Sequence, residues 1–214
     1  MSDAPGVDIV DERVEPKVLS SEVLHEGRIW DVRCDVVELE DGQQVTREVI
    51  VHPGAVGVIA LDDRDRVLLV RQYRHPVSAY LWEPPAGLLD VPGEPALECA
   101  RRELFEEAGY RAREWHVLVD FFNSPGGNTE VFRCFLARGL TRVEEAQRHV
   151  GEGEERDMPT AWLALDDAVE RVLDGRLHNP TAVAGILAAH AARAGGWRKL
   201  RSGDEPWPDR PEHG

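Results

Sequence analysis

The chain has 214 residues, of which 42% are hydrophobic and 30% are charged, and its formal net charge is −15 at pH 7. That length suffices for one average-to-large domain, or for a domain with a smaller appendage, and for an ample core. The negative charge argues against nucleic acids and anionic membranes as partners, since both would be repelled, and an anionic substrate must be met by local cations.

The cysteines and the apolar runs indicate the cellular compartment of the protein. Cys34, Cys99 and Cys134 are odd in number and far apart, which fits neither a disulfide framework nor a zinc site. No apolar run reaches the ~18 residues of a membrane span, and residues 1–12 are acidic and lack the apolar centre of a secretion signal. We therefore expect a cytoplasmic protein.

The N-terminal part predicts a small antiparallel sheet. Residues 1–16 are rich in Asp, Glu and Pro, and we expect them to be mobile. Residues 18–24, 29–39 and 44–52 have the composition of strands, and the Asp41-Gly42 step favours a tight hairpin between the last two. A three-stranded sheet buries little surface alone, so it should pack on the main domain or on a second subunit.

The next segment predicts a second hairpin. Residues 54–63 and 66–76 contain two apolar runs that are joined by a polar turn at residues 62–65. The second run leads to Arg71, Gln72, Arg74 and His75. Arginines in such a place form either plain ion pairs or phosphate contacts, for which the planar guanidinium is well shaped, and the sequence leaves both open.

One helix is predicted after Pro84 and Pro85, which hold the backbone extended. Pro95 suits its first position and Gly109 suits the left-handed residue that ends it, about fourteen residues later. An apolar stripe that should face the core comprises Leu97, Ala100, Leu104 and Ala108.

Three carboxylates gather on one edge of this helix. Glu103 and Glu107 are one turn apart, Glu106 flanks them, and Arg102 is the cation nearest the strip. Like charges at this spacing cost a few tenths of a kcal/mol per pair, and more when desolvated. A divalent cation would resolve that conflict, and oxygen ligands on a rigid helix suit Mg²⁺ or Mn²⁺. The alternative is a solvated acidic face, and residue spacing decides between the two.

That spacing resembles the Nudix box, Gly-x5-Glu-x7-Arg-Glu-U-x-Glu-Glu-x-Gly-U, in which U is apolar. Tyr110 is an acceptable aromatic residue at the last position. The front departs from the pattern, because six residues rather than five separate Gly87 from Glu94, which we interpret as a longer turn at residues 90–93. The other matching positions are Glu94, Arg102, Glu103, Leu104, Glu106, Glu107 and Gly109.

Beyond the helix, the chain predicts further strands, two helices and a tail. Residues 140–157 form a long acidic loop, and loops of this length are usually functional or disordered. Asn179 suits the N-cap of the last helix. The Pro-rich end should form a loose tail, although its Trp197 and Trp207 could dock on the domain. The strands are expected at residues 114–122, 130–137 and 158–165, and the helices at residues 166–174 and 180–193.

The order of elements predicts an α+β fold, and the Nudix resemblance implies an α/β/α sandwich with a mixed sheet, preceded by the small antiparallel sheet. Pro125, fifteen residues past the box, resembles the mark of the ADP-ribose pyrophosphatase branch. The run LWEPPAGLLDVPGEP resembles actinobacterial members, in which the N-terminal sheet is exchanged in a homodimer. The expected parts are a mobile N-terminus (1–16), a dimerising sheet (17–52), the catalytic domain (53–195) and a tail (196–214).

The resemblance implies metal-dependent hydrolysis of ADP-ribose to AMP and ribose 5-phosphate, with two to three Mg²⁺ or Mn²⁺ ions. Another nucleoside diphosphate derivative, such as a nucleotide sugar, NADH or a dinucleoside polyphosphate, is the first alternative, because the box reads only the diphosphate. A noncatalytic ligand-binding module is the second. It is disfavoured because all three box glutamates are present.

Functional residues follow from the resemblance by position. Glu107 and Arg102 belong to the catalytic set, and Arg102 with Glu94 should orient the helix and its acids. A glutamate of the late loop, Glu154 or Glu155 rather than Glu152, should act as base or bind metal through water. The metal ligands are Glu103, Glu106, Glu107 and the Ala86 carbonyl, and the substrate contacts are Arg47, Glu48, Arg74 and Glu130, of which the first two would reach across the dimer.

Overall fold

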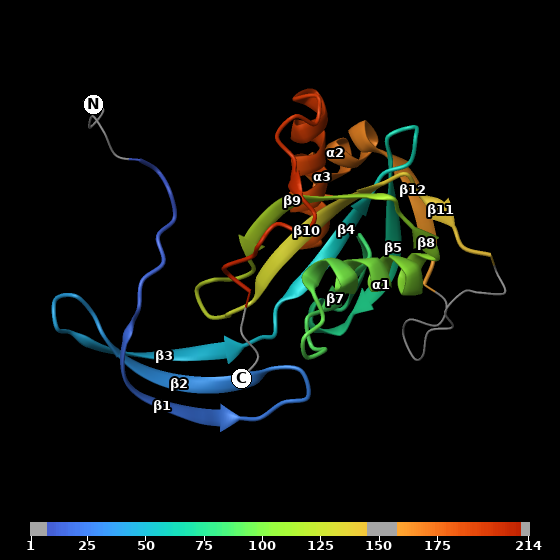
Figure 1. The fold of residues 1–214 in the computed structure, drawn as a ribbon. Coiled ribbons are helices and arrows are strands. Elements are labelled where there is room, and N and C mark those ends of the chain that lie inside the picture. The colour runs from blue at the N-terminus through green and yellow to red at the C-terminus, as the bar shows by residue number, and fades with distance from the viewer. Residues whose placement is uncertain (1–7, 145–157, 211–214) are drawn as a thin grey trace. The chain divides into compact units, whose positions relative to one another are not determined.

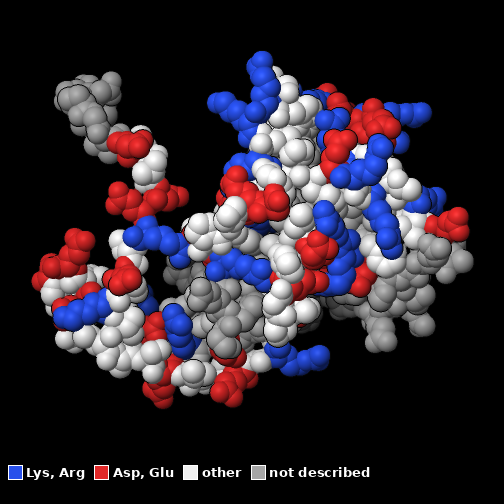
Figure 2. Space-filling view, in the orientation of Figure 1, with Lys and Arg blue, Asp and Glu red and all other residues white. Residues whose placement is uncertain are grey.

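The computed structural model describes residues 8–144 and 158–210. The chain divides into two compact units, Met1–Val51 and His52–Gly214, which we call the N-terminal unit and the C-terminal unit. Of the helices in the described stretches, none is both long and apolar enough to span a membrane. On the face drawn in Figure 2, acidic and basic side chains are interspersed, and the described residues there form no single basic patch.

The N-terminal unit is a three-stranded antiparallel sheet of β1 (Lys17–His25), β2 (Asp31–Glu38) and β3 (Gln44–Val51), in that order (Figure 1). The predicted hairpin is confirmed: Gly42 has a φ of +83°, and its N–H donates to the carbonyl of Leu39 at 2.9 Å. Glycine adopts this left-handed conformation without the cost that a β-carbon imposes. All nine residues of β1 are exposed.

The C-terminal unit contains two sheets and three helices. The five-stranded sheet has the order β13-β9-β10-β4-β7 and is mixed, because β10 runs parallel to β4, and the three-stranded sheet has the order β12-β5-β6. Two further short strands, β8 and β11, pair with each other. The elements are β4 (Ala55–Ala60), β5 (Arg66–Arg74), η1 (His75–Val77), β6 (Ala79–Glu83), β7 (Ala86–Leu88), α1 (Ala96–Ala108), β8 (Tyr110–Arg111), β9 (Glu114–Phe122), β10 (Val131–Arg138), β11 (Thr141–Arg142), β12 (Thr160–Ala164), α2 (Leu165–Leu173), α3 (Pro180–Ala194) and β13 (Arg201–Ser202).

The alternation of side chains along β4 builds the layers. Val56 and Val58 pack in one cluster with the buried residues of α1, whereas Ile59 and Leu61 pack in another with those of α2 and α3. Successive residues of a strand point to opposite faces, so one strand serves both clusters. Figure 1 shows α1 on one side of the sheet and α2 with α3 on the other. The predicted α+β sandwich, with its mixed sheet and preceding antiparallel sheet, is confirmed.

The helix ends follow the expected chemistry. Gly109 ends α1 with a φ of +69°, and its N–H donates to the carbonyl of Phe105 at 3.0 Å. Pro95 is the N-cap rather than the first helical residue, so α1 is 13 residues long. At the start of α3, the Asn179 side chain accepts a hydrogen bond from the N–H of Ala182 at 2.9 Å, as predicted.

The predicted hairpin at residues 54–76 is wrong. The chain turns at residues 62–65, but β4 and β5 then enter different sheets and are linked only by an isolated bridge between Leu61 and Val67. Both edges of β4 are taken by β10 and β7, so β5 pairs with β6 and β12 instead. A pattern of two apolar runs joined by a polar segment predicts the turn, but it does not predict with which strands the two runs pair.

The C-terminal segment is not loose as far as residue 210, and both of its tryptophans dock on the core, as the sequence allowed. Arg201 and Ser202 form β13 against β9, and Trp207 packs against the core cluster that α1 completes. Trp197 packs against the other cluster. Proline-rich composition excludes long helices and strands, but it does not prevent large aromatic side chains from anchoring an irregular segment.

Candidate metal and diphosphate site

The packing of α1 places its acids at the edge of the core. Glu103 is 9% exposed, and Glu106 and Glu107 are half-buried. Because residues three and four apart share a helix face, the buried residues fix which way the glutamates point. The residues that α1 buries beside Glu103 are Cys99, Ala100, Leu104 and Ala108.

β7 lies directly against the acids. A β-carbon added to Gly87 would be 2.1 Å from Oε1 of Glu103, and the N–H of Ala86 donates to Oε2 of Glu107 at 3.0 Å. The extra residue before the helix is absorbed in the turn, where Gly93 has a φ of +77° and the N–H of Glu94 donates to the carbonyl of Val91 at 3.2 Å. The insertion therefore leaves Ala86 and Gly87 beside the box glutamates.

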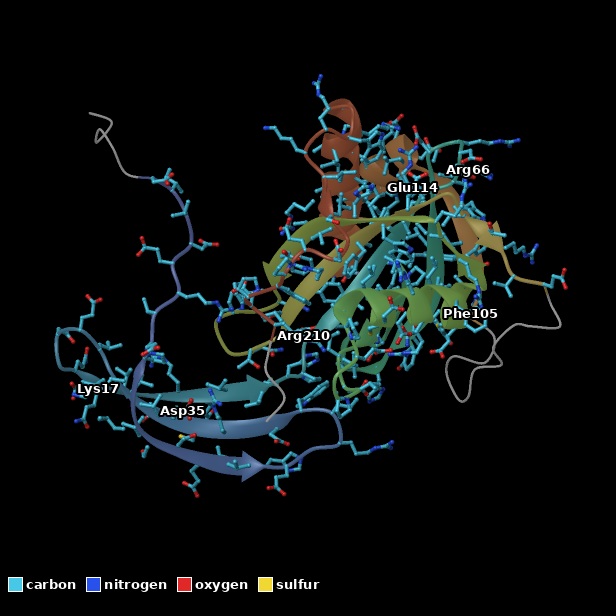
Figure 3. All side chains as sticks on the ribbon, viewed as in Figure 1. Lys17, Asp35, Arg66, Phe105, Glu114 and Arg210 are labelled. Atoms are coloured by element: carbon cyan, nitrogen blue, oxygen red, sulfur yellow. The ribbon has the colours of Figure 1, made fainter. Side chains whose placement is uncertain are left out.

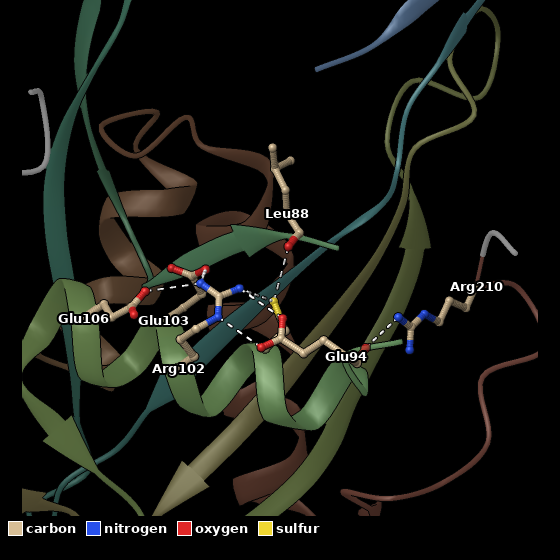
Figure 4. Close-up of polar contacts among 7 residues, drawn as sticks. Leu88, Glu94, Arg102, Glu103, Glu106 and Arg210 are labelled. Carbon is tan, nitrogen blue, oxygen red and sulfur yellow. Dashed lines mark hydrogen bonds and ion pairs between the residues drawn. The ribbon is translucent and has the colours of Figure 1, made fainter. Parts of the chain in front are cut away.

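Arg102 ties the acids together (Figure 4). Its guanidinium forms two hydrogen bonds of 3.0 Å with the carboxylate of Glu94. Its Nη1 also donates to Glu103 at 2.5 Å and to Glu106 at 3.2 Å. The hydrogen bond from Arg102 holds the pKa of Glu94 below its usual range, and that same bond raises the pKa of Arg102. One cation thus orients three carboxylates.

The donor set fits a hard divalent cation. Within residues 8–144 and 158–210, no three His, Cys, Asp or Glu side chains lie close enough to hold a metal as they stand. Glu103 and Glu106 instead share one cationic atom, Nη1 of Arg102, and Glu107 is anchored on the backbone of Ala86. Carboxylate oxygens are the ligands that Mg²⁺ and Mn²⁺ prefer. Such an ion would share these acids with Arg102.

A cavity of about 470 Å³ is lined in part by Arg102. Its lining includes Glu94 but neither Glu103 nor Glu107. Because the two acids most closely fixed against β7 lie outside it, we do not place the diphosphate in this cavity.

Arg74 forms the ion pair that the sequence left open. Its guanidinium donates to both carboxylate oxygens of Glu83, at 2.9 and 2.6 Å, and the Glu83 side chain is only 2% exposed. Arg71 lies over the ring of Tyr80 at 4.6 Å. Glu83 escaped notice in the sequence, although an acid that directly follows the apolar residues of the strand AYLWE is a signal of a buried pair.

Glu130 lies in a second polar cluster, next to β10. It accepts a hydrogen bond of 2.8 Å from the side chain of Asn123, and Nε2 of His52 is 3.9 Å from its carboxylate. Burial lowers the pKa of His52, while the charge of Glu130 acts in the opposite direction. Asn123 and Glu130 lie seven residues apart, on either side of the turn between β9 and β10, whereas His52 comes from a distant part of the chain. Neither Asn123 nor His52 carried a sequence signal.

The remaining predicted residues belong to the N-terminal unit or lie outside the described residues. Arg47 and Glu48 lie on β3 in the N-terminal unit. Arg47 is opposite Asp35 of β2 in the strand register, and its side chain donates to the carbonyl of Thr46 at 3.0 Å. Glu152, Glu154 and Glu155 lie outside the described residues. Their roles stay predictions.

Comparisons with known proteins extend over both units. A profile of the NUDIX domain matches residues 51–183, and one of the nucleoside diphosphate sugar hydrolase N-terminal domain matches residues 16–50. The chain is 46% identical over 195 residues to an ADP-ribose pyrophosphatase of Mycobacterium tuberculosis, covering 91% of this chain and 92% of that protein. It is 36% identical over 159 residues to an ADP-ribose pyrophosphatase of Bacillus subtilis, covering 74% and 84%. The crystal structure of an ADP compounds hydrolase matches with a TM-score of 0.72 at 23% identity, covering 88% of this chain and 100% of that chain, so the fold is shared.

Proposed function

Because the chain belongs to the Nudix family, we propose that it hydrolyses the diphosphate bond of ADP-ribose, yielding AMP and ribose 5-phosphate. The observation that carries the proposal is the acidic edge of α1, which Arg102, Ala86 and Gly87 hold in place. The likeness to two ADP-ribose pyrophosphatases supports the choice of substrate.

The reaction uses a divalent metal, for which Glu103, Glu106, Glu107 and the Ala86 carbonyl are the proposed ligands. Two to three Mg²⁺ or Mn²⁺ ions suit a diphosphate with several anionic oxygens. When bound, such ions neutralise phosphate charge and lower the pKa of the attacking water.

The chain's own residues fix the geometry. The hydrogen bond from the Ala86 N–H orients the carboxylate of Glu107. The hydrogen bonds from Arg102 orient the carboxylates of Glu103 and Glu106. Preorganised charges at a partly dry site stabilise developing charge without further rearrangement. Glu154 or Glu155 is the proposed base that accepts the proton of the attacking water.

Four residues are proposed to contact the substrate: Arg47, Glu48, Arg74 and Glu130. Arg74 could hold a phosphate only through the part of its guanidinium that Glu83 leaves exposed, since its side chain is 43% exposed. For Arg47 and Glu48, the proposal requires a homodimer in which the N-terminal sheet serves the partner subunit.

Exposed apolar residues of the N-terminal unit support that homodimer. A three-stranded sheet is rarely stable without a packing partner. Large apolar side chains that stay exposed in one compact region mark interaction surfaces. In this unit they include Val18, Leu19, Val23, Leu24, Ile29 and Trp30.

A nucleotide sugar is the second candidate substrate. The observation that favours it is the match of residues 16–50 to the nucleoside diphosphate sugar hydrolase N-terminal domain. The acids of α1 would act in the same way, because they address the diphosphate and not the attached group.

One substrate panel tests both candidates. Phosphate-product release is measured from ADP-ribose, ADP-glucose, GDP-mannose, NADH and diadenosine polyphosphates, with Mg²⁺ and with EDTA. We expect metal-dependent AMP release that is strongest with ADP-ribose. Faster turnover of GDP-mannose or ADP-glucose would favour the second candidate, and no turnover of any compound would contradict both.

A pair of variants tests the site itself. Glu107→Gln should keep the fold and lose nearly all activity, because the amide is a poor metal ligand. Glu98→Gln is the matched control, since Glu98 is an exposed acid of the same helix that pairs with Arg101 at 2.6 Å. Equal activity in both variants would contradict the assignment of Glu107.

A further inference from the structure

The C-terminal segment from Arg201 to Arg210, which we call the strap, runs from the five-stranded sheet to the start of α1. It begins as β13, which pairs with β9 through Arg201 and Ser202. It ends where Nη2 of Arg210 donates to the backbone carbonyl of Glu94 at 2.6 Å. In Figure 3 Arg210 lies near the start of α1, and Phe105 lies toward the other end.

Arg133 makes the middle of the strap a fixed support. This residue is 2% exposed and forms two hydrogen bonds with the carboxylate of Asp120, at 2.8 and 3.0 Å. Its Nη1 donates to the carbonyl of Glu205 at 2.8 Å, and its guanidinium lies over the ring of Trp207 at 4.6 Å. Buried bidentate pairs and cation–π contacts hold one geometry, so the strap has a rigid anchor on the sheet.

The start of α1 has no side-chain cap, and the residue before it is bonded by two arginines. Its N-cap is Pro95, which forms no side-chain capping bond. The first N–H groups of a helix have no partner within it, and a capping side chain often accepts a hydrogen bond from one of them. Glu94, just before the cap, is held by Arg210 through its carbonyl and by Arg102 through its side chain.

These contacts form a continuous path into the acidic strip. Arg210 bonds the backbone of Glu94, the side chain of Glu94 bonds Arg102, and Arg102 bonds Glu103 and Glu106 (Figure 4). Partners that orient metal ligands without touching the metal commonly affect metal affinity about 10- to 100-fold.

We propose that the strap is a positioning element for the acids of α1, and that Arg210 is the positioning residue through which it acts. The inference rests on the metal site proposed above. A purely structural strap would stabilise the whole C-terminal unit without changing the affinity of folded protein for metal. A positioning strap changes that affinity at equal fold content.

Mn²⁺ binding to the full chain without substrate separates these cases. Binding is measured by calorimetry and by the electron paramagnetic resonance signal of free Mn²⁺. In Arg210→Ala we expect a Kd for Mn²⁺ about five- to tenfold higher than in the parent, because Arg210 lies one step farther from the ligands than Arg102 does. Arg198→Ala is the matched control, since it removes one exposed arginine on the turn after α3.

Arg210→Lys keeps a hydrogen-bond donor at the same place and should restore much of the Mn²⁺ affinity. If Arg210→Ala does not fold, the Kd of Arg210→Lys is compared with that of the parent instead. A parent-like Kd in folded Arg210→Ala would overturn the inference, even if its Tm were lower. If the parent binds Mn²⁺ and all these variants bind it equally well, the positioning role of the strap is contradicted and the metal site is not. If the parent binds no Mn²⁺, both the proposed metal site and the positioning role of the strap are contradicted.

The route through Glu94 has its own test. Glu94→Gln keeps the carbonyl that Arg210 bonds but weakens the hold on Arg102. If the strap acts through this side chain, adding Arg210→Ala to Glu94→Gln should not weaken Mn²⁺ binding further. Hydrogen exchange without metal should also be faster at residues 94–104 in Arg210→Ala than in Arg198→Ala. Fully additive losses in affinity with unchanged exchange would contradict the route.

Discussion

Gly87 lies so close to Glu103 that a β-carbon on the glycine would be 2.1 Å from Oε1 and 2.5 Å from Cγ of the glutamate. The backbone of β7 therefore determines where this carboxylate can lie. Glycine is required here by close approach rather than by backbone conformation.

Gly87→Ala should cost activity far more than stability. The glutamate can swing away at an expense of roughly 0.5–1.5 kcal/mol for a strained rotamer, so the fold should survive. Its displaced carboxylate should lower kcat/KM by about tenfold or more, as one lost metal contact would. Gly127→Ala is the control, because a β-carbon there meets nothing within 4 Å. Parent-like kcat/KM in Gly87→Ala would contradict the placement of Glu103 at the site.

Arg102→Ala should destabilise the protein much more than Arg101→Ala. Arg102 is 31% exposed on its side chain and serves three carboxylates, so we expect a loss of about 2–3 kcal/mol in the free energy of unfolding. Arg101 forms one exposed pair with Glu98, which contributes about 0.5 kcal/mol or less. Urea unfolding in EDTA measures both. Similar losses would mean that Arg102 does not organise the strip.

Arg74 and Glu83 allow the structural and substrate roles of Arg74 to be separated. Arg74→Ala leaves the buried Glu83 charge unpaired, which should cost about 3 kcal/mol or more. The double variant Arg74→Met with Glu83→Leu removes both charges and should regain most of that stability. If Arg74 also contacts the substrate, the KM of the stable double variant stays raised. A parent-like KM would remove Arg74 from the substrate contacts.

His52 should make stability depend on pH below about 6.5. Burial lowers its pKa in the folded state, with Glu130 opposing, so the unfolded chain binds the proton more readily. The stabilisation is fully present above the unfolded pKa and is lost as pH falls through the folded pKa. His52→Asn keeps an acceptor for the Gly54 N–H without titrating. Between about pH 8 and pH 5, urea unfolding should show a smaller loss of stability in this variant than in the parent.

The sequence predicted α1 and its acids because both depend on local spacing. Helical periodicity places Ala100, Leu104 and Ala108 inward, and the same periodicity puts Glu103 at the edge of the core. The left-handed Gly109 is a local requirement too, and it was found in the same way.

What the sequence did not predict depends on contacts between distant residues. The partner of Arg74 is nine residues away across a strand pair, and the partner of the Glu94 carbonyl is Arg210, 116 residues away. The pairing of β4 with β10 rather than β5 is likewise a choice among strands. The periodicity of the sequence predicts on which face of its helix or strand a side chain lies. It does not predict which other element packs on that face.

The short strand β13 has a consequence for the time course of synthesis. It covers part of the outer edge of β9, yet about 80 residues separate the two strands, so at 5–20 residues per second the ribosome needs roughly 4–16 s to deliver it. During that interval β9 presents open backbone groups to other nascent chains. A messenger RNA with slowly translated codons after β9 should therefore yield more aggregated protein. The last strand would then protect the nascent chain against self-association.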